Sequence, residues 1–274
     1  MRVHPLAAVL AGLTTVAAGR ASLPSPSALA STRSSCFLLE EVGVGEVRRA
    51  PADGCRTRVS PFSTFKVPHA LAAIDAGVVS GADATLPYDG SPQPNEAWRH
   101  DHSLATAMKY SVVWYFQRVA GMLGQTREQE YLRKFHYGNE DPTSNLTSFW
   151  LGESLLISPE EQRDFLLRMY RGELPVSANA LETVERILVQ PSGVVVNATG
   201  EHPFGGPWRS GVLVRAKTGA GRDRAGLEIR WVVGQVGRQG REWVFVSCVT
   251  DREPLAPLAA IDLASRSLRE SGVL

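Results

Sequence analysis

Short strand-like runs stand near both ends of the 274-residue chain, and its middle has a different pattern. Near the start, residues 36–41 (CFLLEE) and 46–50 (EVRRA) flank the segment VGVG, an arrangement that predicts a hairpin. Near the end, apolar runs separated by glycine-containing segments predict strands at residues 211–219, 227–237 and 242–250. Strands are therefore expected early and late in the chain.

Apolar residues in the middle of the chain recur at helical spacing. They stand at positions 104, 108, 112, 116, 119 and 123, a stripe that predicts one helix between residues 102 and 124, ending before Gly124. Three more helices are predicted at residues 126–136, 158–170 and 178–189. The second of these opens with Ser158, Pro159 and two glutamates, which suit the positive end of a helix.

Two further helices and one loop complete the pattern. Residues 70–76 form a helical stretch that Gly77 ends, and residues 255–271 form a closing helix. Pro68 has no backbone donor, so the first turn of the earlier helix is expected to be irregular, or regular hydrogen bonding to begin after it. Residues 82–98 are rich in proline, glycine, aspartate and asparagine and predict a loop.

This order of elements predicts an α+β fold. Its central antiparallel sheet takes strands from both ends of the chain and is flanked by helices, with a mainly helical part between. We expect one domain over residues 22–274, with its sheet part at about residues 35–80 and 200–274 and its helical part at about residues 81–199. The length of the chain is sufficient for one large domain.

The first 21 residues have the pattern of a secretory signal peptide. Arg2 and His4 precede the apolar run LAAVLAGLTTVAAG, which is too short to span a bilayer, and small residues offer a cleavage site near Ala21. A buried N-terminal helix is the alternative interpretation. No other apolar run is long enough for a membrane span, so the mature chain is expected to be secreted and without one.

Composition and charge exclude several classes of partner. With 43% hydrophobic and 21% charged residues the chain has an ordinary globular composition. Its formal net charge is +1, and no run of lysine and arginine is long enough for binding nucleic acid. The oligomeric state stays open.

Three cysteines bear on redox state and metal binding. In an exported protein Cys36 and Cys55 could form a disulfide, while Cys248 in the apolar run WVFVSCVT is expected to be a buried thiol. No cysteine or histidine set has metal-ligand spacing, so no metal site is expected.

Ser63 and Lys66 are the first candidates for chemistry, in the segment STFK. A serine hydroxyl is a weak nucleophile and needs a neighbouring base, and residues three apart lie on the same face of a helical turn. Burial near Phe65 and Val67 would lower the pKa of the lysine and let it accept a proton. Taken alone, the four residues better fit a helix-capping serine followed by a solvated lysine.

Three further short motifs follow in order. Ser111 stands two residues before Val113 in YSVV, Tyr137–Asn139 form the turn-like YGN, and VRAKTGAG contains Lys217, Thr218, Gly219 and Ala220 at the end of a predicted strand. Each could separately be a core helix, an ordinary turn or the exit of a strand. Together with STFK they resemble the motif set of the class D β-lactamases, the oxacillinases. Longer stretches such as DHSLATAMKYSVV and YGNEDPTSNLTSFWL extend this resemblance over almost the whole mature chain.

The resemblance implies a fold like that of the penicillin-binding transpeptidases and hydrolysis of small-molecule β-lactam antibiotics. It implies that Ser63 is the nucleophile, that Lys66 is carboxylated on its side-chain nitrogen (N6-carboxylysine) and acts as general base, and that Trp150 hydrogen-bonds this carbamate. Carbon dioxide or bicarbonate for this modification would be the only added reagent, with no other cofactor. Phe65 and Val113 would line the apolar surroundings of the lysine.

The remaining roles also follow from the resemblance. Ser111 would pass a proton to the departing β-lactam nitrogen, with Lys217 holding that path electrostatically. Thr218 would contact the substrate carboxylate, and Gly219 and Ala220 would line the substrate. The backbone N–H groups of Ser63 and Ala220 would form an oxyanion hole. The YGN turn would support the wall of the site.

The sequence also departs from the family pattern. Ala220 stands where an aromatic residue is common, and Trp114 where proline is common. No arginine lies in the stretch EPLAPLAAID before the closing helix, where many members have one that binds the substrate carboxylate. The substitutes considered are Arg222, Arg224 or Arg252, or a hydroxyl such as Ser210 acting with Thr218.

Three alternatives to a hydrolase share the motif. A receptor sensor domain would stay acylated, but such domains are tethered by membrane helices. A peptidoglycan transpeptidase usually has an anchor and further domains, for which this chain has no room. A member of the family without activity stays open because of Ala220. The expected location is the bacterial periplasm.

Overall fold

The computed structural model describes Met1 and residues 33–51, 53 and 55–274. The predicted signal peptide, apart from Met1, lies outside the described residues. In this described part, no helix has the length and apolar character needed to cross a membrane.

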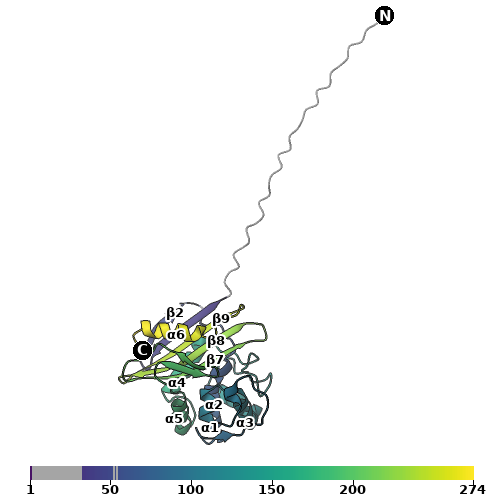
Figure 1. The fold of residues 1–274 in the computed structure, drawn as a ribbon, viewed down its shortest axis with the longest axis vertical. Helices are drawn as coiled ribbons and strands as arrows, with labels where there is room; N and C mark the ends of the chain where they lie inside the picture. Colours follow the sequence, from purple (N-terminus) through teal and green to yellow (C-terminus); the bar gives the residue numbers. More distant parts are fainter. Residues whose placement is uncertain (2–32, 52, 54) are drawn as a thin grey trace. The chain divides into compact units, whose positions relative to one another are not determined.

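A five-stranded antiparallel sheet forms the centre of the folded part, in the order β2-β1-β9-β8-β7 (Figure 1). Its strands are β1 (Ser34–Glu41), β2 (Gly45–Ala50), β7 (Val212–Arg222), β8 (Glu228–Arg238) and β9 (Arg241–Asp251). Strand β1 comes from the early part of the chain and β9 from the late part, and the two pair directly. The predicted α+β fold with a sheet from both ends of the chain is confirmed.

Six helices accompany this sheet in the described residues. They are α1 (Lys66–Asp75), α2 (Leu104–Lys109), α3 (Val113–Lys134), α4 (Pro159–Tyr170), α5 (Ala178–Ile187) and α6 (Ala259–Glu270). Short elements that the sequence pattern did not predict are β3 (Thr85–Leu86), β4 (His102–Ser103), β5 (Val194–Asn197), β6 (Gly200–Pro203) and the 3₁₀ turns η1 (Phe62–Phe65) and η2 (Glu96–Trp98). The predicted capping of the helix at residue 158 is present, since Ser158 and Glu161 form a reciprocal capping box.

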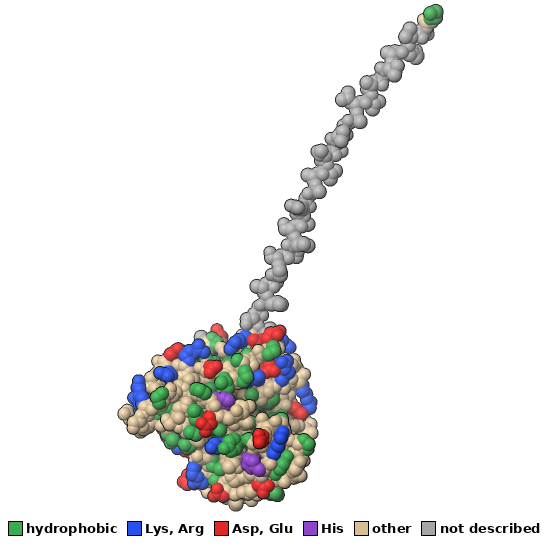
Figure 2. Space-filling view, viewed as in Figure 1, with side chains coloured by type: hydrophobic (Ala, Val, Ile, Leu, Met, Phe, Trp, Pro, Cys, Tyr) green, Lys and Arg blue, Asp and Glu red, His purple; other side chains and the backbone are tan. Residues whose placement is uncertain are grey.

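The sheet separates two hydrophobic cores, because successive side chains of a strand point to opposite faces. On β8, Trp231 and Val233 belong to the core shared with the helical part, whereas Val232 and Val236 belong to the core beneath α6. Figure 1 shows α6 along the sheet, where it contacts β1, β8 and β9. On the face drawn in Figure 2, acidic and basic side chains are interspersed.

The prediction of one helix between residues 102 and 124 is wrong. The chain forms β4 and α2, breaks at Tyr110–Val112, and resumes as α3. Ser111 lies in the left-handed region (φ 57°), which a continuous helix does not allow. The predicted end before Gly124 and the separate helix predicted at residues 126–136 are confirmed, because Gly124 (φ 77°) is non-helical and α3 consists of two helices across a kink there, the second ending at Lys134. The apolar spacing survives the break because both helices turn their apolar sides to the same core.

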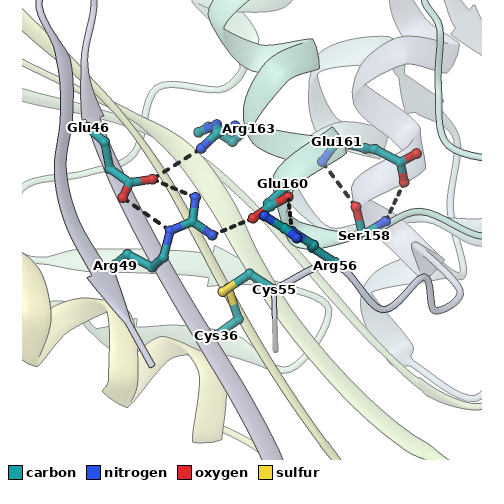
Figure 3. Close-up of a disulfide and its surroundings, with 9 residues drawn as sticks. All are labelled: Cys36, Glu46, Arg49, Cys55, Arg56, Ser158, Glu160, Glu161 and Arg163. Carbon is teal, nitrogen blue, oxygen red and sulfur yellow. Dashed lines mark hydrogen bonds and ion pairs between the residues drawn. A yellow bond between two sulfur atoms is a disulfide. The ribbon is translucent and has the colours of Figure 1, made fainter. Parts of the chain in front are cut away.

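Cys36 and Cys55 form a disulfide, as predicted, which ties β1 to the segment before η1 (Figure 3). Beside it, Arg49 binds Glu46 and Glu160, and Arg163 also binds Glu46. The third cysteine, Cys248, is buried and free, and burial raises the pKa of its thiol well above the ordinary value. Because a protonated thiol is a poor nucleophile, Cys248 is not expected to exchange with the disulfide.

We expect the double variant Cys36→Ser, Cys55→Ser to lose about 3 kcal/mol of unfolding free energy, since the disulfide closes a loop of 19 residues. Urea denaturation measures this loss, and reductant should lower the stability of the wild type but not of the variant. Thiol titration of the denatured wild type should find one thiol. Three thiols, or equal stability of the two proteins, would contradict the prediction.

Candidate active site

Ser63 and Lys66 meet at the junction of η1 and α1. The 3₁₀ turn η1 runs directly into α1, so the two residues share one face, and Lys66 Nζ donates to Ser63 Oγ at 2.8 Å. Pro68 lies in the first turn of α1, where backbone N–H groups have no partner within the helix, so its missing donor costs little. Helix α1 therefore begins before Pro68, with the irregular turn that the sequence predicted placed in η1.

Lys66 is fully buried although it carries an amine. Its Nζ lies 5.4 Å from the centre of the Phe116 ring, and Phe65 beside it is also buried. Burial lowers the pKa of Lys66 well below the ordinary value, and the nearby charge of Lys217 lowers it further. Burial therefore favours the neutral amine, which is the form that can accept a proton.

Ser111 and Lys217 form a second polar pair in the site. The left-handed conformation of Ser111 at the break between α2 and α3 places its hydroxyl toward β7, where Lys217 Nζ donates to Ser111 Oγ at 2.9 Å. Lys217 Nζ also donates to the Thr218 carbonyl at 3.1 Å. Burial lowers the pKa of Lys217 to about 7.

Lys217 should make the stability of the protein depend on pH. Between pH 7 and its ordinary pKa of 10.5, the unfolded chain holds a proton that the folded chain lacks, so this residue's contribution to stability rises with pH. The cost of charging the buried amine is present in full below pH 7. We expect the unfolding free energy of the wild type, minus that of Lys217→Met, to rise by up to about 1.4 kcal/mol per pH unit between pH 7 and 9. Urea denaturation in buffer free of carbon dioxide measures this difference, and a pH-independent difference would contradict the assignment.

The strand β7 lies against η1 because its motif contains glycine at two positions. A Cβ on Gly219 would lie 2.8 Å from the Pro61 carbonyl oxygen, and one on Gly221 would lie 2.1 Å from the Phe62 ring. Both contacts are shorter than van der Waals packing allows, so only glycine lets β7 approach Ser63 this closely. Gly219 thus sets the backbone spacing, while Thr218 and Ala220 face the space in front of Ser63.

Trp150 is fully buried. Its ring contacts those of Phe65, His69 and Phe149, with centroids 5.5, 5.4 and 5.0 Å away. Its Nε1 has no hydrogen-bond partner among the described residues. Leaving a buried donor without a partner costs about 1–3 kcal/mol, so this N–H requires an explanation.

Ser60 fixes the segment that contains Trp150, and the sequence pattern did not single it out. Its hydroxyl donates to the Trp150 carbonyl and accepts from the Gly152 N–H, both at 2.9 Å, while its own carbonyl accepts from Trp231 Nε1 at 3.0 Å. Ser60 therefore joins the loop that contains Trp150 to β8 and to the segment that leads into Ser63. In the sequence it is one serine beside a proline, with nothing to mark it as buried.

The Tyr137–Asn139 turn braces the site from behind, as the resemblance implied. The Tyr137 hydroxyl donates to Gln162 Oε1 at 3.2 Å, and Gln162 Nε2 donates to Thr64 Oγ1 at 2.7 Å. Asn139 exchanges hydrogen bonds with the backbone of the 154–156 segment. The turn touches η1 through Gln162 and places no side chain in the cleft.

A cleft of about 430 Å³ lies in front of Ser63. The predicted residues Ser111, Val113, Thr218 and Ala220 line it, whereas Lys66 and Lys217 lie buried beneath its floor. Its outer walls are supplied by Trp98, Leu151, Pro257, Leu258, Arg222 and Arg230, among others. The cleft is therefore apolar in part, and Glu228 lines it together with the two arginines.

Trp114, which replaces a common proline, supports one of these walls. Its Nε1 donates to the Trp98 carbonyl at 2.8 Å, and Trp98 Nε1 in turn donates to the Tyr110 carbonyl at 2.9 Å. The two indoles thus connect η2 to residues 110–112, the break between α2 and α3 that contains Ser111.

The arginines considered as carboxylate ligands differ in position. Arg222 lines the cleft and binds Glu228, whereas Arg224 is 72% exposed and pairs with Glu153. Neither Arg224, Arg252 nor Ser210 is among the described residues lining the cleft. Arg230, which the sequence analysis did not consider, does line it.

The chain is similar to several known proteins. The family model of the penicillin binding protein transpeptidase domain matches residues 38–265. Beta-lactamase OXA-48 of Klebsiella pneumoniae is 38% identical over 185 residues, which are 68% of this chain and 63% of that enzyme. The solved structure of the class D β-lactamase OXA-427 aligns with a TM-score of 0.74 and 31% identity, covering 86% of this chain and 98% of that one. The chain belongs to the class D β-lactamase family.

Membership of this family confirms the resemblance found in the sequence. Class D β-lactamases are not its only relatives, since the regulatory protein BlaR1 of Bacillus licheniformis is 30% identical over 79% of this chain, a match that spans 33% of BlaR1. The family's motif residues Ser63, Lys66, Ser111 and Lys217 form two hydrogen-bonded pairs here.

Proposed function

We propose that the protein hydrolyses β-lactam antibiotics through an acyl-enzyme on Ser63. The observation that carries this proposal is the contact between Ser63 Oγ and the fully buried Lys66 Nζ at 2.8 Å. Burial disfavours the charged form of this lysine, and the neutral form can serve as the base that a serine nucleophile needs. An ordinary solvated lysine at the same distance could not.

In the acylation step, Ser63 Oγ attacks the β-lactam carbonyl carbon while the Lys66 side chain accepts its proton. The close approach of β7 to η1 supports backbone N–H groups of Ser63 and Ala220 as donors to the developing oxyanion. The ring C–N bond then breaks, and the Ser111 hydroxyl gives a proton to the nitrogen. Lys217, bonded to Ser111 Oγ, stabilises the oxygen as it loses that proton.

Carboxylation of Lys66 by carbon dioxide fits its surroundings. A neutral amine can add carbon dioxide to give a carbamate and a released proton. The Trp150 N–H is a buried donor without a partner among the described residues, on a ring that packs against Phe65. The Trp150 N–H and the Ser63 hydroxyl would hold the modified side chain, and Phe65 would keep water from it. Once formed, the carbamate supplies carboxylate oxygens that can accept a proton.

Hydrolysis of the acyl-enzyme needs a water next to the Ser63 ester and a base to activate it. Lys66 is the proposed base, and Val113 and Leu151 line the cleft beside Ser63. We further propose that the protein is exported through residues 1–21 and acts in the periplasm. The Cys36–Cys55 disulfide supports an oxidising location.

Similarity to BlaR1 favours one alternative, a domain that is acylated by β-lactams without turning them over. The two functions differ only in the fate of the Ser63 ester. Residues that activate water distinguish them, and those residues would be Lys66 and Trp150.

Incubating the purified protein with a chromogenic cephalosporin tests the proposal. We expect many turnovers per protein molecule, faster in added bicarbonate at constant pH and ionic strength. Mass spectrometry of the intact protein should show a transient acyl adduct on Ser63. A stable adduct with no turnover would favour the sensor alternative, and no adduct would refute acyl transfer altogether.

A further inference from the structure

Arg230 has a position that the motifs of the family do not account for. It lies on β8, one strand behind β7, yet its side chain lines the same cleft as Ser63, Ser111 and Thr218. In the antiparallel register it stands directly across from Ala220. Since directly opposed residues of neighbouring strands have Cβ atoms about 5 Å apart, Arg230 is the nearest neighbour of Ala220 on that face.

The small side chain of Ala220 gives Arg230 access to the cleft. Residues 218, 220 and 222 of β7 point to the same face, so a large side chain at 220 would lie between Arg230 and the bound substrate. Opposite this position, the segment before α6 supplies Pro257 and Leu258 to the cleft, and both are uncharged. The small side chain at 220 thus opens the cleft to Arg230, while the segment before α6 supplies no arginine to it.

Hydrogen bonds hold the Arg230 guanidinium while leaving donors available. Its Nη1 donates to the Gly221 and Ile229 carbonyls at 3.3 and 3.0 Å, and Nη2 lies 2.5 Å from Glu228 Oε2. A guanidinium has five N–H donors, and these three contacts leave two. The side chain is only 15% exposed, so a ligand would meet it in one orientation and with little competing water.

Arg230 shares its carboxylate partner with a second cation. Glu228, which also lines the cleft, accepts from Arg222 Nε at 2.9 Å as well as from Arg230, so its one carboxylate is divided between two guanidiniums. An anionic group on the ligand would be a second anionic partner for Arg230. β-Lactams of the penicillin and cephalosporin type carry a carboxylate on the ring fused to the lactam, next to the lactam nitrogen.

We propose that Arg230 is the specificity-determining residue that binds this ring carboxylate, together with Thr218. The inference rests on the proposed function, because it places the substrate in the cleft of Ser63. In this protein the cation comes from the middle of the sheet and reaches over Ala220. It selects β-lactams that bear the carboxylate over neutral ones.

The test compares a chromogenic cephalosporin with its methyl ester, which has the same reactive ring and no ring charge. For Arg230→Gln we expect kcat/KM for the carboxylate to fall by about 10- to 100-fold, mainly through KM, with the ester little affected. Arg230→Lys keeps the positive charge but lacks the planar guanidinium. Its kcat/KM for the carboxylate should lie between those of the wild type and Arg230→Gln. Arg224→Gln removes the same formal charge from an exposed residue paired with Glu153, and should keep the wild-type ratio of the two substrates.

The inference would be overturned if folded Arg230→Gln kept the wild-type ratio of kcat/KM for the acid to kcat/KM for the ester. It would also be overturned if Arg222→Gln lost this preference for the acid while Arg230→Gln kept it. Hydrolysis of the acid by the wild type tests the proposed function separately, so the two failures are distinguishable. If turnover is absent, the rate of Ser63 acylation by acid and ester, followed by mass spectrometry, makes the same comparison. Thermal unfolding verifies that each variant is folded.

Discussion

Lys66→Ala is expected to reduce hydrolysis of a chromogenic cephalosporin by about 10⁴-fold or more, because one side chain serves as base in both halves of the reaction. Without it the Ser63 hydroxyl keeps its proton, and any acyl-enzyme formed has no base to activate water. The fold should survive, since the substitution removes a buried amine whose burial disfavours its charged form. Steady-state kinetics measure turnover, and mass spectrometry follows acylation.

Lys109→Ala is the matched control for this experiment. Lys109 is exposed at the end of α2, two residues before Ser111, and should be replaceable without loss of turnover. Ser63→Ala should match Lys66→Ala in turnover but form no adduct at all. Retention of more than a tenth of wild-type turnover by Lys66→Ala would show that the base is another group.

Trp150→Phe is expected to slow deacylation by about 100-fold while leaving the protein folded. Phenylalanine keeps an aromatic ring against Phe65, His69 and Phe149 but lacks the N–H. Loss of this donor should destabilise the carbamate on Lys66, so the acyl-enzyme should accumulate. Saturating bicarbonate should restore part of the rate. Trp150→Ala should also cost about 3–5 kcal/mol of stability, since it empties a fully buried site.

Carbon-13 NMR with labelled bicarbonate detects the modified lysine directly, and its signal should weaken in Trp150→Phe. Trp208→Phe provides the control, because it removes an indole N–H bonded to the Phe204 carbonyl in the core beneath α6. That variant should keep both the NMR signal and the turnover. An undiminished carbamate signal in Trp150→Phe would exclude the proposed role of the N–H.

Local patterns in the sequence were sufficient for most of the elements. The sequence predicts the runs that form β8 and β9 to within one residue at each end and β7 to within three, because valine-rich stretches bounded by glycine have few alternatives to a strand. The helix at residue 158 was found because Ser158, Pro159 and Glu161 cap it through contacts within one turn. The failure came at residues 110–112, where the apolar spacing continues across a break that the backbone of Ser111 imposes.

The sequence by itself determined that Ser63 and Lys66 lie close together, since residues three apart share one face of a helical turn. It also determined the motif set that identified the family. Only the tertiary structure decided what surrounds them: the burial of Lys66, the approach of β7 to η1, and the unpaired N–H of Trp150. Arg230 belongs to this second group, because its position depends on the register between β7 and β8, and cross-strand register brings together residues whose proximity no local spacing reveals.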